Sequence, residues 1–156
     1  MALFVGEFDL VVDAKHRLAI PAALRDQIVP SQDGRDFYLV LGPDRHLCLY
    51  PDQAYRRTLE PLSQGPLPNR STRRFDLLFA MARVLKPDSQ GRVVLPEKSM
   101  QRAIVSERVT LVGKGDHIEL WPTDEWEKYV AEKLPGYGED VLDAGDGYAS
   151  TGDVQK

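Results

Sequence analysis

A nine-residue stretch that occurs twice is the feature of this sequence that most limits how the chain can fold. The first copy, DAKHRLAIP, occupies residues 13–21, and the second, DSQGRVVLP, occupies residues 88–96. Each copy contains an acid, a small residue, a polar or basic residue, a turn residue, an arginine, three apolar or small residues and a proline. Two such copies, each on a similar strand-and-turn frame, predict a protein of two related halves.

A second set of matching residues follows at a different spacing, 71 residues instead of 75. The matched positions are Leu41-Gly42 with Val112-Gly113, His46 with His117, Leu49 with Leu120, Tyr50-Pro51 with Trp121-Pro122, and Tyr55 with Trp126. The change in spacing places a four-residue insertion in the loop at 29–36 of the first half. Two spacings with one located gap indicate a duplication far more strongly than one shared pentapeptide does.

Hydrophobic periodicity predicts a mixed α+β fold with similar elements in each half. Residues 4–12 alternate as in a strand, and residues 13–16 form a polar turn. Further strands are expected at 37–41, 46–50, 93–95, 109–112 and 117–121. Short helices are expected at 22–28, 51–60, 97–103 and 122–134, and Asn69 or Ser71 can cap another helix after a proline-rich linker at 61–68.

Composition is typical of a soluble cytoplasmic protein. The chain has 156 residues, of which 42% are hydrophobic, and it contains no run of 18 apolar residues, so no transmembrane helix is expected. The alternating, early-acidic N-terminal stretch predicts a strand and not a signal peptide. Because Cys48 is the only cysteine, an internal disulfide is excluded.

The net charge of −4 neither supports nor excludes binding to nucleic acid, because the charge is unevenly distributed. The segment 135–156 contains five acids and one lysine and therefore carries the whole net charge. Between Arg56 and Lys86, seven basic residues occur with only Glu60 and Asp76. Local patches of this kind decide binding to phosphate. The segment 135–156 is rich in Gly and Asp without apolar periodicity, so it is expected to be a disordered acidic tail.

No set of residues in the sequence points to catalysis. Cys48 aligns with Glu119 of the second half and is expected to be an ordinary half-buried strand residue. His46 and His117 are equivalent, but neither has a second histidine or an acid at a spacing typical of metal ligands, so a structural role at the hairpin is favoured. No catalytic residue, cofactor site or metal site is expected, and the chain is interpreted as a protein without enzymatic activity.

The two basic turns remain as the candidate site. Arginine offers a planar fork that suits the O6 and N7 acceptors of guanine, and lysine offers a point charge that suits phosphate. Asp13 and Asp88 are expected to shape the turns by bonding the backbone two residues on. An ordinary solvated turn is the alternative, but the repeated arginine favours DNA, because a symmetric pair can read repeated half-sites.

These residues resemble the MraZ family of bacterial transcriptional regulators, which are built from two AbrB-like (SpoVT-AbrB) repeats. The resemblance covers about residues 1–134 and rests on the two turn motifs and on LCLYP and IELWP, each followed by a short helix. It implies an α+β fold, a duplicated AbrB-like swapped-hairpin β-barrel pseudo-dimer with short peripheral helices. The expected division is a first repeat at 6–53, a helical linker region at 54–81, a second repeat at 82–125, a terminal helix at 126–134 and the acidic tail at 135–156.

The resemblance also implies a function and partners. It implies a sequence-specific regulator, usually a repressor, that binds double-stranded promoter DNA at short direct repeats. These repeats would lie upstream of the division and cell-wall gene cluster that includes its own gene. It further implies a ring-like homo-oligomer without a membrane partner, in the cytoplasm and associated with the nucleoid. By position, Arg17 and Arg92 match the motif arginines, and Lys15 matches the motif lysine.

Two positions depart from the family pattern. His16 replaces the turn glycine, so it must tolerate a positive φ at modest strain, and it can add a donor toward the DNA backbone. Gln90 replaces the second lysine, so the first repeat is expected to be the stronger DNA contact. The expected DNA-binding residues are therefore Lys15, His16, Arg17, Gln90 and Arg92. An oligomeric protein-interaction module, or an antitoxin-like AbrB-fold protein that uses the acidic tail as its partner segment, is the alternative hypothesis.

Overall fold

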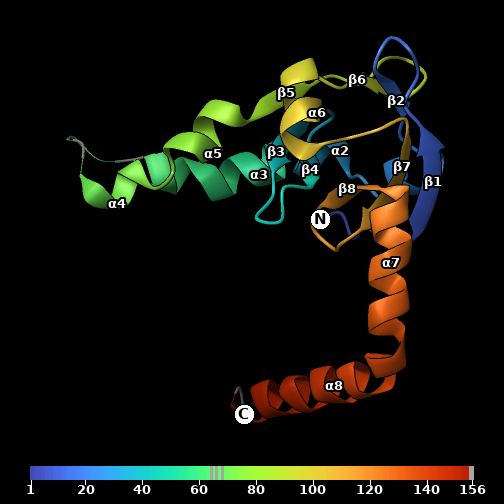
Figure 1. Ribbon diagram of the computed structural model, residues 1–156. Coiled ribbons are helices and arrows are strands. Elements are labelled where there is room, and N and C mark those ends of the chain that lie inside the picture. Colours follow the sequence, from blue (N-terminus) through green and yellow to red (C-terminus); the bar gives the residue numbers. More distant parts are fainter. Residues whose placement is uncertain (64, 66, 68, 155–156) are drawn as a thin grey trace. The chain divides into compact units, whose positions relative to one another are not determined.

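The computed structural model describes residues 1–63, 65, 67 and 69–154 (Figure 1). The first half contains β1 (Glu7–Val11), β2 (Arg17–Ala19), α1 (Ala22–Arg25), α2 (Pro30–Asp33), β3 (Phe37–Leu41), β4 (Leu47–Pro51) and α3 (Asp52–Leu59). A middle segment contains η1 (Glu60–Ser63), α4 (Arg70–Arg73) and α5 (Asp76–Met81). The second half contains β5 (Arg83–Leu85), β6 (Arg92–Val94), α6 (Glu97–Ala103), β7 (Arg108–Gly113), β8 (Ile118–Pro122) and α7 (Thr123–Lys133), followed by η2 (Leu134–Gly136) and α8 (Tyr137–Val154). Positions 64, 66 and 68 of the expected linker, and 155–156 of the expected tail, lie outside the described residues.

Six strands form one antiparallel sheet in the order β1-β7-β8-β4-β3-β5. The first strand of each half pairs with the hairpin of the other half, because β1 lies beside β7 and β5 lies beside β3. At the centre of the sheet β4 pairs with β8, with Leu47 opposite Leu120 and Leu49 opposite Ile118. The two halves therefore exchange their first strands within one continuous sheet.

The strands β2 and β6 form a separate two-stranded antiparallel ribbon. The expected α+β class is confirmed, but no closed barrel forms among the described residues, where the six-stranded sheet keeps β1 and β5 as its edges. Both ribbon strands are three residues long, and Pro21 and Pro96 follow them closely at the starts of α1 and α6. Because proline cannot donate a ladder hydrogen bond, the ribbon pairing cannot extend much beyond these residues.

Alternation along the strands places one face of the six-stranded sheet in the core. Leu49, Leu111 and Ile118 are fully buried there. Leu18 of β2 and Val93 of β6 are equally buried in the same cluster. Burial of each such aliphatic side chain stabilises the fold by roughly 1.5–3 kcal/mol. The small ribbon is therefore anchored to the common core of both halves by its inward face.

The first helices differ from the expected ones, and a buried aspartate accounts for the presence of α2. The helix α1 ends at Arg25, short of the expected end at residue 28, and α2 occupies part of the expected loop at 29–36. The buried Asp33 accepts hydrogen bonds from the backbone N–H groups of Val29 (2.8 Å) and Ala2 (3.2 Å). These bonds fix the loop as a turn of helix, and only the folded chain brings Ala2 to Asp33. Asn69 caps α4 as expected, through a capping box with Thr72.

The described residues from Asp124 onward form a second compact unit. The sequence predicts a disordered tail, whereas the structure places Tyr137–Val154 in α8. Acidic side chains in the first turn favour a helix at that end, and Ser150 and Thr151 donate to the carbonyls of Asp146 and Gly147 one turn earlier. None of the described helices is long and apolar enough to cross a membrane.

Candidate functional site

In the first turn, the Asp13 carboxylate organises both the backbone and the arginine. Its Oδ1 accepts hydrogen bonds from the backbone N–H groups of Lys15 (2.9 Å) and Arg17 (2.8 Å). Its Oδ2 accepts from the Nε of Arg17 at 2.7 Å. One side chain therefore closes the turn and sets the direction of the guanidinium group.

The second turn repeats this arrangement bond for bond. The Oδ1 of Asp88 accepts from the backbone N–H groups of Gln90 (2.8 Å) and Arg92 (3.0 Å), and its Oδ2 accepts from the Nε of Arg92 at 2.8 Å. The two arginine side chains are also almost equally exposed, at 35% for Arg17 and 34% for Arg92. The prediction that the aspartates shape the turns is confirmed.

The same bonds lower the pKa of both carboxyl groups below the usual aspartate value. The backbone N–H of Arg17 is the largest cause for Asp13, and the backbone N–H of Arg92 is the largest cause for Asp88. Ion pairs at the surface contribute little to stability. Their effect in these turns is to orient the arginines.

The turn residues before the arginines both adopt left-handed backbone conformations. His16 has a φ of 60° and Gly91 a φ of 77°, so the prediction that His16 tolerates a positive φ is confirmed. The carbonyl of His16 accepts from the backbone N–H of Leu95 (2.8 Å), and that of Gly91 accepts from Ile20 (3.0 Å). Each turn is thus hydrogen-bonded to the strand of the other half.

The register of β2 and β6 places both arginines on one surface. Arg17 lies opposite Val94, and Ala19 lies opposite Arg92. Directly paired residues share a face of a ribbon, and the intervening Leu18–Val93 pair is buried, so these four side chains face outward. Arg17 and Arg92 are diagonal neighbours, with Cα atoms roughly 7–8 Å apart. We call the outward surface of Arg17, Ala19, Arg92 and Val94, together with the exposed turn residues Lys15 and Gln90, the ribbon face.

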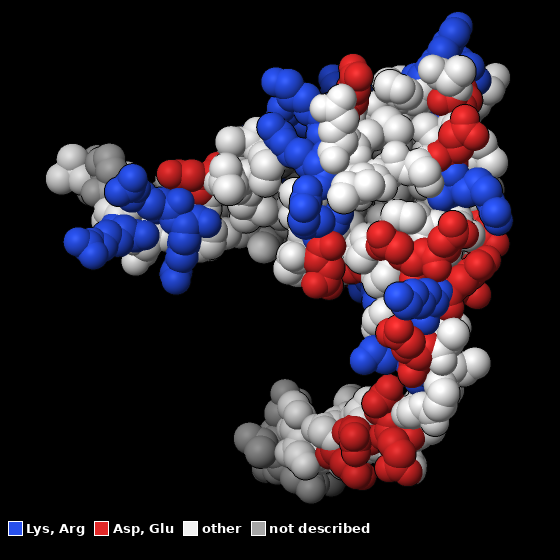
Figure 2. All heavy atoms as spheres, viewed as in Figure 1, with Lys and Arg blue, Asp and Glu red and all other residues white. Residues whose placement is uncertain are grey.

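All five predicted DNA-binding residues lie on the two turns of this ribbon, and their contact with DNA stays a prediction. In the space-filling view, basic side chains project at the end of the body that carries β2 and β6 in Figure 1 (Figure 2). Acidic side chains gather instead along α8, as the uneven charge of the sequence indicates (Figure 2).

Arg25 is a further basic residue at this site that sequence reasoning did not identify. It extends from the last turn of α1, and its Nε donates to the carbonyl of Ile20 at 2.9 Å. A Cβ added to Gly91 would lie 2.5 Å from that Nε, so Arg25 of the first half lies against the turn of the second half. Only the pairing of β2 with β6 reveals this proximity, because the two residues are distant in sequence.

The two hairpin histidines pack against aromatic rings of the opposite half. His46 stacks on Trp121 with ring centroids 3.8 Å apart, and His117 stacks on Tyr50 at 4.8 Å. This stacking agrees with a structural role at the hairpin for both histidines.

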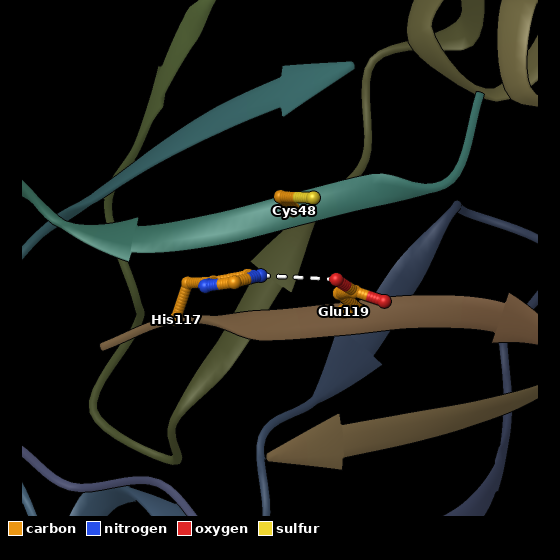
Figure 3. Close-up of side chains that lie close together, drawn as sticks. All are labelled: Cys48, His117 and Glu119. Atoms are coloured by element: carbon orange, nitrogen blue, oxygen red, sulfur yellow. Dashed lines mark hydrogen bonds and ion pairs between the residues drawn. The ribbon is translucent and has the colours of Figure 1, made fainter. Parts of the chain in front are cut away.

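The expectation that neither histidine has a second histidine or an acid at a spacing typical of metal ligands is wrong for His117. Its Nε2 lies 3.0 Å from Oε2 of Glu119, which follows two residues later in β8. Cys48 of β4 lies beside both (Figure 3). One potential ligand atom from each residue lies within 4.8 Å of the others. Alternate residues of a strand share a face, and the register sets Cys48 opposite Glu119. The His-x-Glu spacing was the signal available in the sequence.

Cys48 is more deeply buried than expected, at 5% exposure. Burial and the neighbouring Glu119 carboxylate raise the pKa of its thiol to about 12. Burial also opposes the ionisation of Glu119, but hydrogen bonds from His117 and Trp121, together with the charge of Lys114, outweigh it and lower the pKa of this carboxyl. The thiol alone is therefore a poor nucleophile at neutral pH.

Comparison with known proteins matches nearly the whole duplicated region to one family model. The model described as "MraZ protein, putative antitoxin-like" matches residues 3–78 and 78–135. The chain belongs to the MraZ family. The two matched segments of this MraZ chain agree with the duplication that the sequence predicts.

Relatives of this MraZ-family chain come from several organisms. A protein named transcriptional regulator MraZ from Clostridium tetani is 32% identical over 87% of this chain and 99% of its own length. Its namesake from Bifidobacterium longum is 33% identical over 90% of this chain and 91% of its own. The one from Thioalkalivibrio sulfidiphilus is 38% identical over 81% of this chain and 84% of its own.

Proposed function

We propose that this chain is a sequence-specific DNA-binding transcriptional regulator that contacts DNA through the ribbon face. The observation that carries the proposal is that Arg17 and Arg92 share one outward surface, each held by an aspartate through its Nε. The name of the relatives, transcriptional regulator MraZ, supports a role in transcription.

Orientation by the aspartates suits the arginines to read bases. Because the carboxylate binds the Nε of each guanidinium, the two terminal Nη groups are left for another partner. Two parallel N–H donors match the O6 and N7 acceptors of guanine in the major groove, which admits a two-stranded ribbon. Arg17 and Arg92 therefore read guanines, and the ribbon fixes the separation between them.

The surrounding cations bind phosphate. Lys15 extends from the tip of the first turn, and His16 offers a ring N–H beside it. Gln90 can donate only a neutral hydrogen bond at the second tip, but Arg25 places a positive charge against that turn. The first turn remains the stronger DNA contact, and Arg25 narrows the difference in DNA affinity between the two turns.

The family resemblance supplies the finer parts of the proposal. The chain acts as a repressor at short direct repeats upstream of the division and cell-wall genes, including its own gene, and associates with the nucleoid. Several copies assemble into a ring, so individually weak turn contacts add through high effective concentration. The strand exchange supports two repeats, at 6–53 and 82–125, that pack as a swapped-hairpin pseudo-dimer joined by the 54–81 linker region. Residues 126–134 form a terminal helix and 135–156 an acidic tail.

Alanine substitution of each arginine tests the proposal on a duplex from upstream of the chain's own gene. Arg17→Ala and Arg92→Ala should each weaken specific binding by about 1–3 kcal/mol and relax the preference at one base pair. Lys15→Ala should instead weaken binding to all duplexes alike and reduce the salt slope by about 1. Fluorescence anisotropy at several salt concentrations measures both effects.

Arg56→Ala is the matched control. Arg56 on α3 makes the same kind of pair, with its Nε 2.7 Å from Glu60, but it lies outside the ribbon face. Its substitution should leave specific binding unchanged. Equal affinity of the Arg17→Ala, Arg92→Ala and original chains would rule out this surface as the DNA reader.

A protein-binding role is the second candidate, and the antitoxin-like description of the family model favours it. In that case the acidic tail at 135–156 binds a basic partner protein. Removal of the tail then abolishes capture of that partner but preserves specific DNA binding.

A further inference from the structure

We infer that Cys48, His117 and Glu119 form a binding site for a transition-metal ion, with chemistry best suited to Zn²⁺. Cys48 lies on β4, Glu119 on β8 and His117 directly before β8, on the face of the sheet opposite Leu47 and Leu49 of the core (Figure 3). The inference is independent of the proposed DNA contact, which involves other residues on another sheet.

The donor set selects the kind of metal. A thiolate, an imidazole and a carboxylate are each established ligands of Zn²⁺ in proteins. Magnesium and calcium require oxygen ligands throughout, so the sulfur of Cys48 disfavours them. Three protein ligands leave a fourth tetrahedral position for water.

The separations of the ligand atoms are close to those that a tetrahedral ion requires. Zinc bond lengths imply about 3.3–3.6 Å between neighbouring ligand atoms. The His117 and Glu119 atoms lie 3.0 Å apart, and no pair among the three exceeds 4.8 Å. Side-chain rotations that move the ligand atoms by little more than about 1 Å therefore complete the geometry.

Neighbouring residues already hold two of the ligands in place. Asp116 lies 2.7 Å from Nδ1 of His117, so it can accept the Nδ1 proton and leave Nε2 for the metal. The Nε1 of Trp121 donates to Oε1 of Glu119 at 3.0 Å, and the ring of Tyr50 stacks on His117. Outer partners of this kind are typical of metal sites in proteins.

Charge balances when the ion binds. The Cys48 thiol releases its proton to solvent as the metal–sulfur bond forms, and the Glu119 carboxylate is already ionised. One thiolate and one carboxylate neutralise a divalent cation, so no net charge is buried. The ion replaces the direct hydrogen bond between His117 and Glu119.

The location of the site gives the ion a structural consequence. Cys48 belongs to the first half of the chain, whereas His117 and Glu119 belong to the second. A bound ion therefore links the two halves across the centre of the sheet. Because it binds the folded chain, it raises the thermal midpoint of unfolding in proportion to the logarithm of its concentration.

Titration of the metal-free full chain with Co²⁺, a spectroscopic substitute for Zn²⁺, tests the site. We expect one equivalent to bind, with a thiolate-to-cobalt charge-transfer band in the near ultraviolet, and Zn²⁺ to displace it. Since the chain contains one cysteine, that band reports Cys48 alone. Cys48→Ala should abolish the band, and His117→Gln and Glu119→Gln should each weaken Co²⁺ binding at least tenfold.

His46→Gln is the matched control, because His46 is the counterpart of His117 in the repeat and also stacks on an aromatic ring. It should leave the band and the affinity unchanged. A band weakened equally by His46→Gln and His117→Gln would trace the signal to ring packing and overturn the assignment. X-ray absorption of the zinc-loaded original chain needs no variant. It should reveal one sulfur at about 2.3 Å, and a shell of only nitrogen and oxygen would refute the site.

Discussion

At the scale of single residues, the two turns reach one backbone shape with two different residues. His16 and Gly91 both have positive φ, although a side chain in this region costs roughly 1–2 kcal/mol. Gly91 has a second constraint, since a Cβ there would meet Arg25. The histidine is therefore tolerated at a cost in stability, whereas a side chain at position 91 would also have to displace Arg25.

The first prediction concerns this difference. His16→Gly should raise the free energy of unfolding by about 0.5–1 kcal/mol, because the gain in left-handed backbone exceeds the entropy cost of glycine. Gly91→Ala should lower it by about 1–3 kcal/mol through strain and the Arg25 contact. Urea denaturation measures both values. Destabilisation by His16→Gly would mean that the imidazole contacts matter more than the backbone.

The second prediction uses the lowered pKa of Asp13 and Asp88. A carboxyl with a lowered folded-state pKa stabilises the fold above its ordinary value of 3.8. That contribution is lost as the pH falls below 3.8 through the folded-state value. At neutral pH the original chain should unfold at a higher temperature than the Asp13→Asn, Asp88→Asn variant. This gap between the two midpoint temperatures should close in acid. Thermal melts across this range measure the gap, and one independent of pH would contradict the assignment.

Single residues also set the limit of what the sequence could predict about the site. The aspartates, both arginines and the strain at His16 follow from the motif itself. Arg25 and the Cys48–Glu119 pairing do not, because each depends on the register between strands of different halves. A pattern along one chain contains no direct record of that register.

At the scale of elements, local patterns predicted the longer strands well, but they did not predict β2 or β5 and placed some helix ends wrongly. The strand β3 and the helix α6 have the expected bounds, because a short apolar run in one and the preceding proline in the other define them. The presence of α2 depends on the buried Asp33, which accepts hydrogen bonds from Val29 and from distant Ala2. Such a tertiary contact overrides local propensity and leaves no periodic signal.

The third prediction addresses α8, whose glycines led to the expectation of disorder. Gly145 and Gly147 lie inside this exposed helix, and each costs about 1 kcal/mol relative to alanine. The double change Gly145→Ala, Gly147→Ala should increase helical circular dichroism of the full chain. Gly115→Ala is the control, since that glycine has a φ of 81° in the β7–β8 turn and should add no helix. An unchanged spectrum in the double variant would favour the disordered tail that the sequence predicts.

At the scale of the whole molecule, charge is distributed unevenly along the chain. The segment 135–156 carries the entire net charge of −4, and the remainder is neutral. For a DNA-binding protein, an acidic segment opposes approach to phosphate at long range.

The fourth prediction is that truncation after Leu134 strengthens DNA binding several-fold at low salt, with the gain disappearing at high salt. A full-length control, with the tail acids Glu139, Asp140, Asp143, Asp146 and Asp153 changed to their amides, separates charge from chain length. It should bind like the truncated chain. Equal affinity of the truncated and complete chains at low salt would exclude an electrostatic role for the tail.

The exchange of β1 and β5 between the halves has a consequence for how this chain could diverge. A chain with one repeat would need a second identical copy to complete the sheet, and every residue at the symmetry axis would then face itself. Fusion removes that restriction, because each half can mutate alone. The axis of this chain accordingly holds a cysteine opposite a glutamate, and its turns hold a histidine and a glycine. The fused chain can therefore place different side chains at equivalent positions of a symmetric fold. A pair of identical chains cannot do this.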